Sequence, residues 1–283
     1  AIAGVDEVYA VGGAQAVGAM AYGTETIRPV DVIVGPGNVF VALAKREVAG
    51  LVGVPSSFPG PSEVVVIADA SVPPELAAVD VILQAEHGPG GLAWLISWDA
   101  DALDAIVAEI EAQVTSAPRR ADIESTFAEG GYAVLVDSPE QAVAVSNTIA
   151  PEHLELLTED PAALVDRVRH AGAVFCGPWS PASVGDYLAG PSHVLPTDGT
   201  ARFGSALTVG DFQKDVHVIT LDREAVERAA PIVAAIARAE GLAAHAESVE
   251  RRARRAQGGD GAPCNVSHSA NLWVRAAPRP DVR

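Results

Sequence analysis

The chain has 283 residues, of which 49% are hydrophobic and 20% charged, a composition typical of a globular protein. The formal net charge of −18 argues against a nucleic-acid partner, and no uninterrupted apolar run reaches the roughly 18 residues that a membrane span needs. The two cysteines, Cys176 and Cys264, belong to no paired motif. We therefore expect no disulfide framework and a cytoplasmic location.

The first 50 residues alternate short apolar runs, glycine turns and helix-like segments. Strands are expected at 5–11 and 30–34, followed by the turns "GGAQA" and "GPGN" and by helices at 14–23 and 39–50. With no initiator Met and a strand almost at once, the chain is expected to begin inside a domain. Either turn could place backbone N–H groups near a nucleotide phosphate. Neither has the full G-x-G-x-x-G pattern, so a plain tight turn is the alternative.

The alternation continues downstream. A fully buried strand is expected at 62–69, further strands at 92–98, 132–137, 154–158 and 173–177, and helices at 73–87, 99–114, 138–150 and 161–172. Strands alternating with helices predict an α/β fold, a doubly wound, Rossmann-like arrangement of parallel sheet layers. Residues 177–203 are rich in Gly, Pro and Ser without periodicity, and long irregular segments of this kind are often functional. Residues 224–255 are expected to be helical, and the tail over 257–283 disordered.

The stretch "QAEH" ends one of the expected helices with two possible metal ligands. Gln84 and His87 are three residues apart, so they share a helix face and could hold one ion. The alternative is an ordinary histidine at a helix end.

A second Glu-His pair occurs in "PEHLE". Glu152 and His153 could supply a carboxylate and an imidazole for acid/base chemistry, or they could be a solvated Glu beside a histidine at a helix end. Two further pairs of an acidic residue and a histidine follow: Asp186 with His193 in the irregular segment, and Glu240 with His245 near the C-terminal end.

Taken together, eight motifs resemble those of the histidinol dehydrogenase family, in the same order. They are "VGGAQA", "GPGN", "GPSEVVVIAD", "QAEHGP", "PEHLE", "GDYLAGPSHVLPT", "DFQK" and "EGLAAHAES", and they span Val11 to Ser248. The resemblance implies an NAD-dependent oxidoreductase of histidine biosynthesis. Such an enzyme oxidises L-histidinol through an aldehyde to L-histidine with two NAD⁺.

The resemblance also implies a zinc site and a homodimer. The implied zinc ligands are Gln84, His87, Asp186 and His245, and two nitrogens with two oxygens suit zinc. The zinc would bind the imidazole and amine of the substrate. His245 and Glu240 would reach the site of the partner subunit.

For the chemistry, the resemblance assigns both residues of the second Glu-His pair. His153 would accept the alcohol proton, and Glu152 would activate the water that adds to the aldehyde. The implied substrate contacts are Ser62, Gln84, His87, His153, Asp186, His193, Glu240 and His245. The implied NAD contacts are Gln15 and Asn38, one on each glycine turn.

Four regions are expected from the resemblance and the sequence pattern. They are a partial Rossmann-like NAD-binding domain (1–61), a second Rossmann-like domain with the zinc and catalytic residues (62–205), a helical dimerisation arm (206–256) and a disordered tail (257–283). The chain departs from the family at "SSFPG" and at Ser192, where Asn is usual, and the family's usual chain is longer at its N-terminus. Two alternatives are therefore open: a related dehydrogenase of another small polar alcohol, or an inactive, truncated chain that binds metal.

Overall fold

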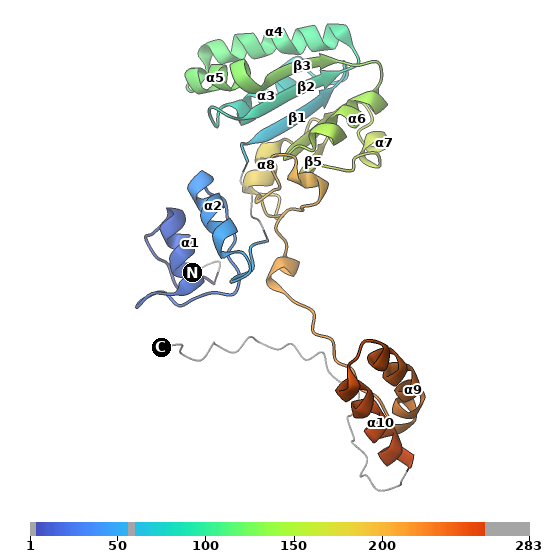
Figure 1. Ribbon diagram of the computed structural model, residues 1–283. Helices are drawn as coiled ribbons and strands as arrows, with labels where there is room; N and C mark the ends of the chain where they lie inside the picture. Colours follow the sequence, from blue (N-terminus) through green and yellow to red (C-terminus); the bar gives the residue numbers. More distant parts are fainter. Residues whose placement is uncertain (1–3, 56–59, 258–283) are drawn as a thin grey trace. The chain divides into compact units, whose positions relative to one another are not determined.

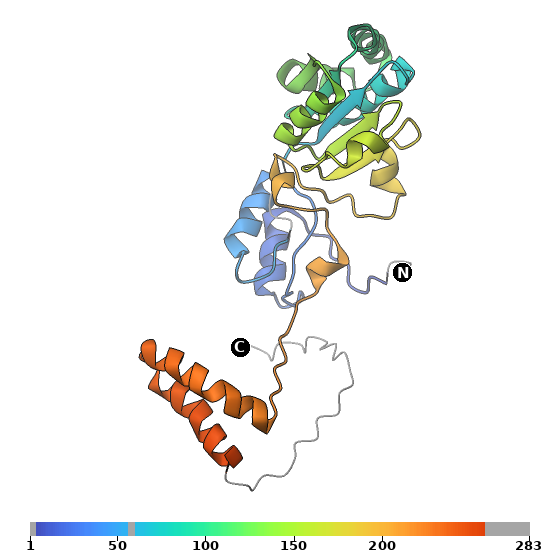
Figure 2. The ribbon, with the colours of Figure 1, turned by 90° about the vertical axis from the view of Figure 1, so that its right-hand side faces the viewer.

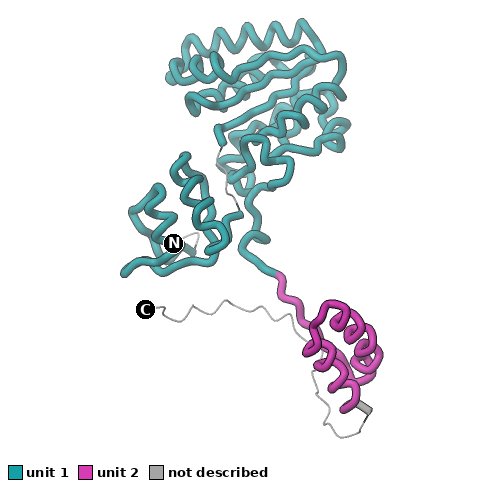
Figure 3. Tube along the Cα trace, in the orientation of Figure 1, with its two compact units in different colours: residues 1–214 teal, residues 215–283 magenta. Residues whose placement is uncertain are grey.

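A computed structural model describes residues 4–55 and 60–257. These fall into two compact units, residues 1–214 and 215–283, which are coloured separately in Figure 3. The disordered tail predicted for 257–283 lies outside the described residues, apart from Gln257, which ends the last helix. Across 4–55 and 60–257, no helix is long and apolar enough to cross a membrane.

A five-stranded parallel sheet forms the centre of the first unit. Its strands are β1 (Glu63–Ala68), β2 (Leu92–Ser97), β3 (Gly131–Leu135), β4 (His153–Leu157) and β5 (Ala173–Cys176). They lie in the order β3-β2-β1-β4-β5, and every neighbouring pair is parallel. The central strands β1 and β4 are buried along their whole length, as expected of strands covered on both faces.

Helices cover both faces of this sheet, as Figures 1 and 2 show. They are α3 (Pro74–Ala85), α4 (Ala100–Ser116), α5 (Arg120–Gly130), α6 (Pro139–Ile149) and α7 (Ala162–Val165). Because side chains alternate along a strand, Val64 and Val66 of β1 pack with α3 and α4, whereas Val65 and Ile67 pack with α6 and α7. The predicted doubly wound α/β fold is confirmed.

Two helices differ from the sequence prediction. The helix α5 was not predicted. The helix expected over 161–172 stops at Val165, because the side chain of Asn147 takes up main-chain groups beyond it. Its Oδ1 accepts from the N–H groups of Arg169 at 2.7 Å and His170 at 3.2 Å, and its amide donates to the carbonyl of Arg167 at 3.0 Å. These bonds replace the helical ones and lead the chain into β5.

The N-terminal segment contains helices α1 (Gly13–Tyr22) and α2 (Val39–Val48) around a small core of their own. The strands expected at 5–11 and 30–34 are not formed. Within residues 4–55, the extended chain makes only isolated bridges, such as that of Val32 with Gly53. Val8 is 85% exposed, so its run has neither a pairing partner nor a buried face. Both predictions of strands were wrong, because apolar residues make a strand only beside another strand.

The second unit is a pair of helices, α9 (Arg223–Ala239) and α10 (Ala243–Gln257). They pack through Ala234, Ala237 and Ala246, and Gly241 turns the chain between them with a φ of 77°. Small side chains let the two helices approach closely. The helical arm at the C-terminal end is therefore present as predicted.

Candidate functional site

The first unit gathers its candidate catalytic residues at the amino ends of β1 and β4. These strands are neighbours, and Val64 pairs with His153, so Glu63 and Glu152 precede the same pair. A helix that follows a parallel strand runs back across the sheet, which returns the end of α3, with Gln84, to the same edge. Ligands of doubly wound sheets usually bind at the opposite, carboxyl edge.

His153 is the centre of this cluster and is only 3% exposed. Its Nδ1 lies 3.1 Å from Nε2 of Gln84, 3.2 Å from the carbonyl oxygen of Glu63 and 3.5 Å from Oε2 of Glu152. Its Nε2 lies 3.5 Å from Oδ1 of Asp186 and has no hydrogen-bond partner within the described part of the chain. One ring nitrogen is thus held by the protein, and the other faces a carboxylate.

The surroundings of His153 change its proton affinity in opposite directions. Burial lowers the pKa of its imidazole, whereas the hydrogen bond and charge of Glu152, the charge of Asp186 and the carbonyl of Glu63 raise it, with a net increase. The ring also stacks on Phe175, with centroids 5.9 Å apart. The imidazole therefore has a fixed plane and a stabilised protonated form.

Asp186 comes from α8 (Ala182–Tyr187), a short helix inside the segment 177–203 that was expected to be irregular. A Cβ at position 185 would lie 2.6 Å from the ring of Phe175, so only Gly185 lets this helix approach the ring. That approach places Asp186 beside His153.

Glu152 and Glu63 are linked by reciprocal hydrogen bonds. The N–H of Glu63 donates to Oε2 of Glu152 at 3.1 Å, and the N–H of Glu152 donates to Oε2 of Glu63 at 3.3 Å. The amide of Gln84 adds a longer bond to Oε2 of Glu152, at 3.4 Å. Burial raises the pKa of the Glu63 carboxyl to about 7, although the N–H groups of Asp198 and Glu152 lower it.

Two of the predicted zinc ligands in the first unit, Gln84 and His87, have an atom that could coordinate a metal ion. Gln84 is buried and, in the described chain, its Oε1 has no hydrogen-bond partner, so a buried acceptor is left without a donor. Nδ1 of the exposed His87 lies 3.2 Å from the carbonyl oxygen of Gln84, which leaves Nε2 for a metal. Among residues 4–55 and 60–257 there is no group of three or more His, Cys, Asp or Glu spaced for a metal ion. The fourth predicted ligand, His245, belongs to the other unit.

Within the first unit, no hydrogen bond or ion pair among the described residues joins Ser62 or His193 to this cluster. Ser62 is half-buried directly before β1, and His193 is exposed after α8. Glu240 and His245 are exposed in the second unit, at the end of α9 and the start of α10.

The two predicted NAD contacts lie at the starts of the N-terminal helices. Gln15 is exposed in the first turn of α1. Asn38 caps α2, where its Oδ1 accepts from the N–H groups of Phe40 at 3.1 Å and Val41 at 3.2 Å. The "GPGN" turn thus has a structural role as a helix cap.

Three buried acidic positions were missed in the sequence: Glu63, Asp80 and Glu155. Glu63 begins β1, and Glu155 lies in the middle of β4 with no exposed surface. Burial and the neighbouring Asp80 raise the pKa of the Glu155 carboxyl to about 9, and its Oε1 accepts from the N–H of Ala182 at 3.1 Å. The available signal was an acidic residue inside an otherwise apolar run, because such residues are rarely buried without a reason.

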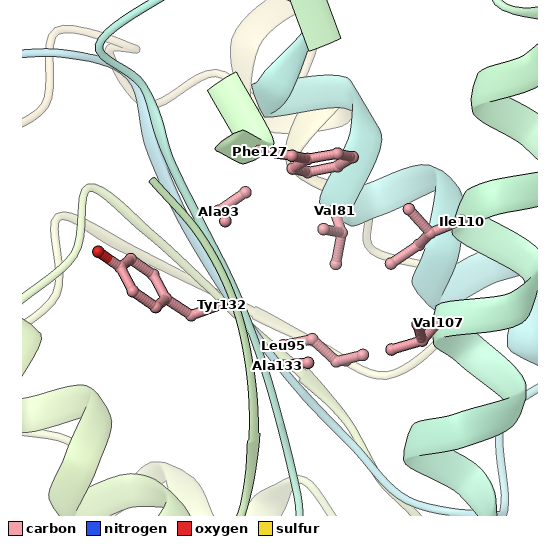
Figure 4. A pocket seen from close by; sticks show the side chains of 9 residues that line it. Val81, Ala93, Leu95, Val107, Ile110, Phe127, Tyr132 and Ala133 are labelled. Carbon is pink, nitrogen blue, oxygen red and sulfur yellow. The ribbon is translucent and has the colours of Figure 1, made fainter. Parts of the chain in front are cut away.

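A separate cavity of about 180 Å³ lies between the sheet and α3, α4 and α5. In Figure 4, Phe127, Val81 and Ile110 face the sheet residues Ala93 and Leu95 across it, and no charged side chain is among its lining residues. Its walls offer no carboxylate, imidazole or thiol, so it is a gap in core packing and not the catalytic site.

Comparison with known proteins identifies the family. The model of the protein family "Histidinol dehydrogenase" matches residues 1–253 of this chain. Histidinol dehydrogenase of Synechococcus sp. is 52% identical over 250 residues, which are 88% of this chain and 57% of that protein. The Bacillus subtilis protein of the same name is 48% identical over 252 residues, covering 89% of this chain and 59% of the relative.

A solved structure agrees with these relatives. The crystal structure of histidinol dehydrogenase from Elizabethkingia anophelis superposes with a TM-score of 0.85 and 36% sequence identity, covering 90% of this chain and 59% of that one. The chain thus spans less than two thirds of the length of the relatives that it matches. A match over nearly all of this sequence, at about half identity and with the same fold, shows that the chain belongs to the histidinol dehydrogenase family.

Proposed function

We propose that this chain carries the catalytic centre of a zinc- and NAD-dependent histidinol dehydrogenase, which oxidises L-histidinol through the aldehyde to L-histidine. The observation that carries the proposal is the buried imidazole of His153, whose Nε2 has no hydrogen-bond partner in the described chain and faces Asp186. Family membership makes histidinol the first substrate to test.

In this proposal, His153 is the base of the first oxidation. If Nδ1–H donates to the carbonyl of Glu63, Nε2 carries the lone pair that accepts the hydroxyl proton of the substrate. The pKa of the imidazole is raised, which favours holding that proton once it has been accepted. NAD⁺, bound near Gln15 and Asn38, would accept one hydride in each oxidation.

Glu152 is the base of the second oxidation. Its carboxylate is 13% exposed, next to His153, so it can accept a proton from a water that adds to the aldehyde carbon. The resulting hydrate is an alcohol again, and it can lose a second hydride to give the carboxylic acid. The overall balance is one alcohol, one water and two NAD⁺ giving one carboxylic acid, two NADH and two protons.

The zinc would be held by Gln84, His87 and Asp186 of one subunit and by His245 of a second subunit. When bound, it would hold the imidazole and amine of the substrate. The buried Oε1 of Gln84 supports this assignment, because it has no protein donor among the described residues.

The homodimer is part of the same proposal. It is supported by apolar side chains on the second unit, where Ile232 and Ile236 of α9 are 64% and 57% exposed. A partner subunit that covers these residues would also supply its own Glu240 and His245 to the site of the first subunit. A cytoplasmic location stays a prediction.

The test measures NADH formation and zinc content for the purified chain and for His153→Asn, with L-histidinol as substrate. We expect the variant to lose turnover and keep its zinc, because His153 is assigned to chemistry and not to the metal. His217→Asn, at an exposed position, is the matched control and should behave as the wild type. Loss of zinc in His153→Asn would contradict the assigned role.

Two results would favour the alternatives. NADH formed only with another small polar alcohol would indicate a related dehydrogenase. Bound zinc without NADH from any alcohol would indicate a chain that binds metal but does not catalyse oxidation.

A further inference from the structure

Glu63 has no part in the proposed chemistry, yet it makes four contacts at the centre of the site. The residue is 3% exposed at the first position of β1. Its carboxyl accepts from two main-chain N–H groups, that of Glu152 at 3.3 Å through Oε2 and that of Asp198 at 3.1 Å through Oε1. Each oxygen thus holds a different segment of the chain.

The main chain of Glu63 contacts Glu152 a second time and also contacts His153. Its N–H donates to Oε2 of Glu152 at 3.1 Å, and its carbonyl oxygen lies 3.2 Å from Nδ1 of His153. A proton donated from Nδ1 to this carbonyl leaves Nε2 as the basic nitrogen, on the side of Asp186. Glu63 is therefore in contact with both groups that would exchange protons with the substrate.

The segment held by Oε1 is a tight loop close to the start of β1. Asp198 has a φ of 54°, which is uncommon for a residue other than glycine, and the N–H of Gly60 donates to Oγ1 of Thr197. A Cβ at Gly60 would lie 2.8 Å from Cβ of Asp198, so the two segments are in close contact. His193, a predicted substrate contact, precedes this loop by only a few residues.

We propose that Glu63 is a positioning residue that fixes Glu152 and His153 relative to each other and to the loop at Thr197 and Asp198. The inference rests on the proposed function, because it explains how the proposed catalytic groups Glu152 and His153 are held in place. Two main-chain donors approach one carboxyl, so two acceptor oxygens are required. An amide at this position offers only one oxygen and turns an N–H toward the second donor.

The decisive variant is Glu63→Gln, compared with the wild type for kcat, KM and zinc content. We expect kcat with L-histidinol to fall by about tenfold to a hundredfold, the effect of a catalytic group misplaced by up to ~1 Å. KM should change less than about twofold, because the residues assigned to substrate binding are kept. Zinc content should not change.

Glu155→Gln is the matched control, a second buried carboxyl on the adjacent strand. Its Oε1 accepts from one main-chain N–H, that of Ala182, and an amide oxygen can do the same. We expect its kcat to equal that of the wild type. A kcat of Glu63→Gln within about twofold of the wild type would overturn the proposal.

Glu63→Asp keeps both acceptor oxygens on a side chain that is one methylene shorter. We expect a kcat between those of the wild type and Glu63→Gln, which also provides a test if Glu63→Gln does not fold. A wild-type kcat for Glu63→Asp would contradict the positioning role, because catalysis would then not depend on the hydrogen bonds that the longer Glu63 side chain accepts from Glu152 and Asp198.

A spectroscopic measurement separates this inference from the proposed function. The ¹⁵N signals of the His153 ring, assigned with His153→Asn, should move in Glu63→Gln and stay in place in Glu155→Gln. If the wild type oxidises no alcohol, the proposed function fails, and this measurement alone decides the inference. Unchanged His153 signals in Glu63→Gln would then refute it.

Discussion

Glu155 provides a sharp test of how burial affects the stability of this fold. Its side chain has no exposed surface in the middle of β4, and burial together with the nearby Asp80 raises the pKa of its carboxyl from 4.5 to about 9. Burial raises the pKa of Asp80 as well. At neutral pH the folded protein therefore keeps Glu155 protonated, whereas the unfolded chain ionises it.

The sign and size of the effect follow from this difference. A carboxyl with a raised pKa in the folded state contributes its full stability below pH 4.5 and loses it as the pH rises toward 9. Each pH unit in this window removes about 1.4 kcal/mol, so the wild type should lose about 3 kcal/mol between pH 5 and pH 7 from this group alone. Glu155→Gln has no proton to release and should not show this loss.

The assay is urea unfolding of both proteins at several pH values from 5 to 8, followed by tryptophan fluorescence. The free energy of unfolding of the wild type should fall relative to that of Glu155→Gln across this series, and the variant should be the more stable protein at pH 8. Glu129→Gln, at an exposed carboxyl, should run parallel to the wild type. Parallel curves for the wild type and Glu155→Gln over the whole range would refute the reasoning.

Two further substitutions, the first with a control variant, test the local structure. In Gly172→Ala, the new Cβ would lie 2.6 Å from the main-chain oxygen of Glu152, so we expect a loss of about 1–3 kcal/mol and a lower kcat, measured by urea unfolding and NADH formation. Gly18→Ala in α1, where a Cβ meets open space, should keep or raise stability, and equal stability of the two variants would contradict the clash. Asp99→Ala removes the cap of α4, a 3.0 Å bond from the N–H of Ala102, and should cost about 1 kcal/mol in urea unfolding; an unchanged midpoint would exclude this contribution.

The sheet was predictable because its strands carry their own signal. The runs that became β1 and β4 are mostly apolar, as expected of strands covered on both faces, and the helices between them have capping residues such as Ser138. The runs at 5–11 and 30–34 look similar but form no strand. Sequence periodicity describes a side-chain pattern, and whether a neighbouring strand is present depends on the rest of the fold.

The candidate site was predicted in part. Motifs identified Gln84, Glu152, His153 and Asp186, and these four are linked by contacts around one imidazole. Glu63 was missed, because its carboxyl serves two main-chain N–H groups that are distant in sequence. Hydrogen bonds to main-chain groups cannot be predicted from the sequence in this way, because main-chain N–H groups do not depend on residue type.

The sequence by itself determined the family, the parallel α/β sheet and the residue types available for chemistry, because apolar periodicity and motif order are local properties of the chain. Only the tertiary structure decided that the cluster lies at the amino edge of β1 and β4. It also decided that one nitrogen of His153 is held by protein while the other faces Asp186. Burial in the folded protein also raises the pKa of Glu63 to about 7 and that of Glu155 to about 9. The packed fold removes water from these carboxyl groups, and the residue type alone does not determine this.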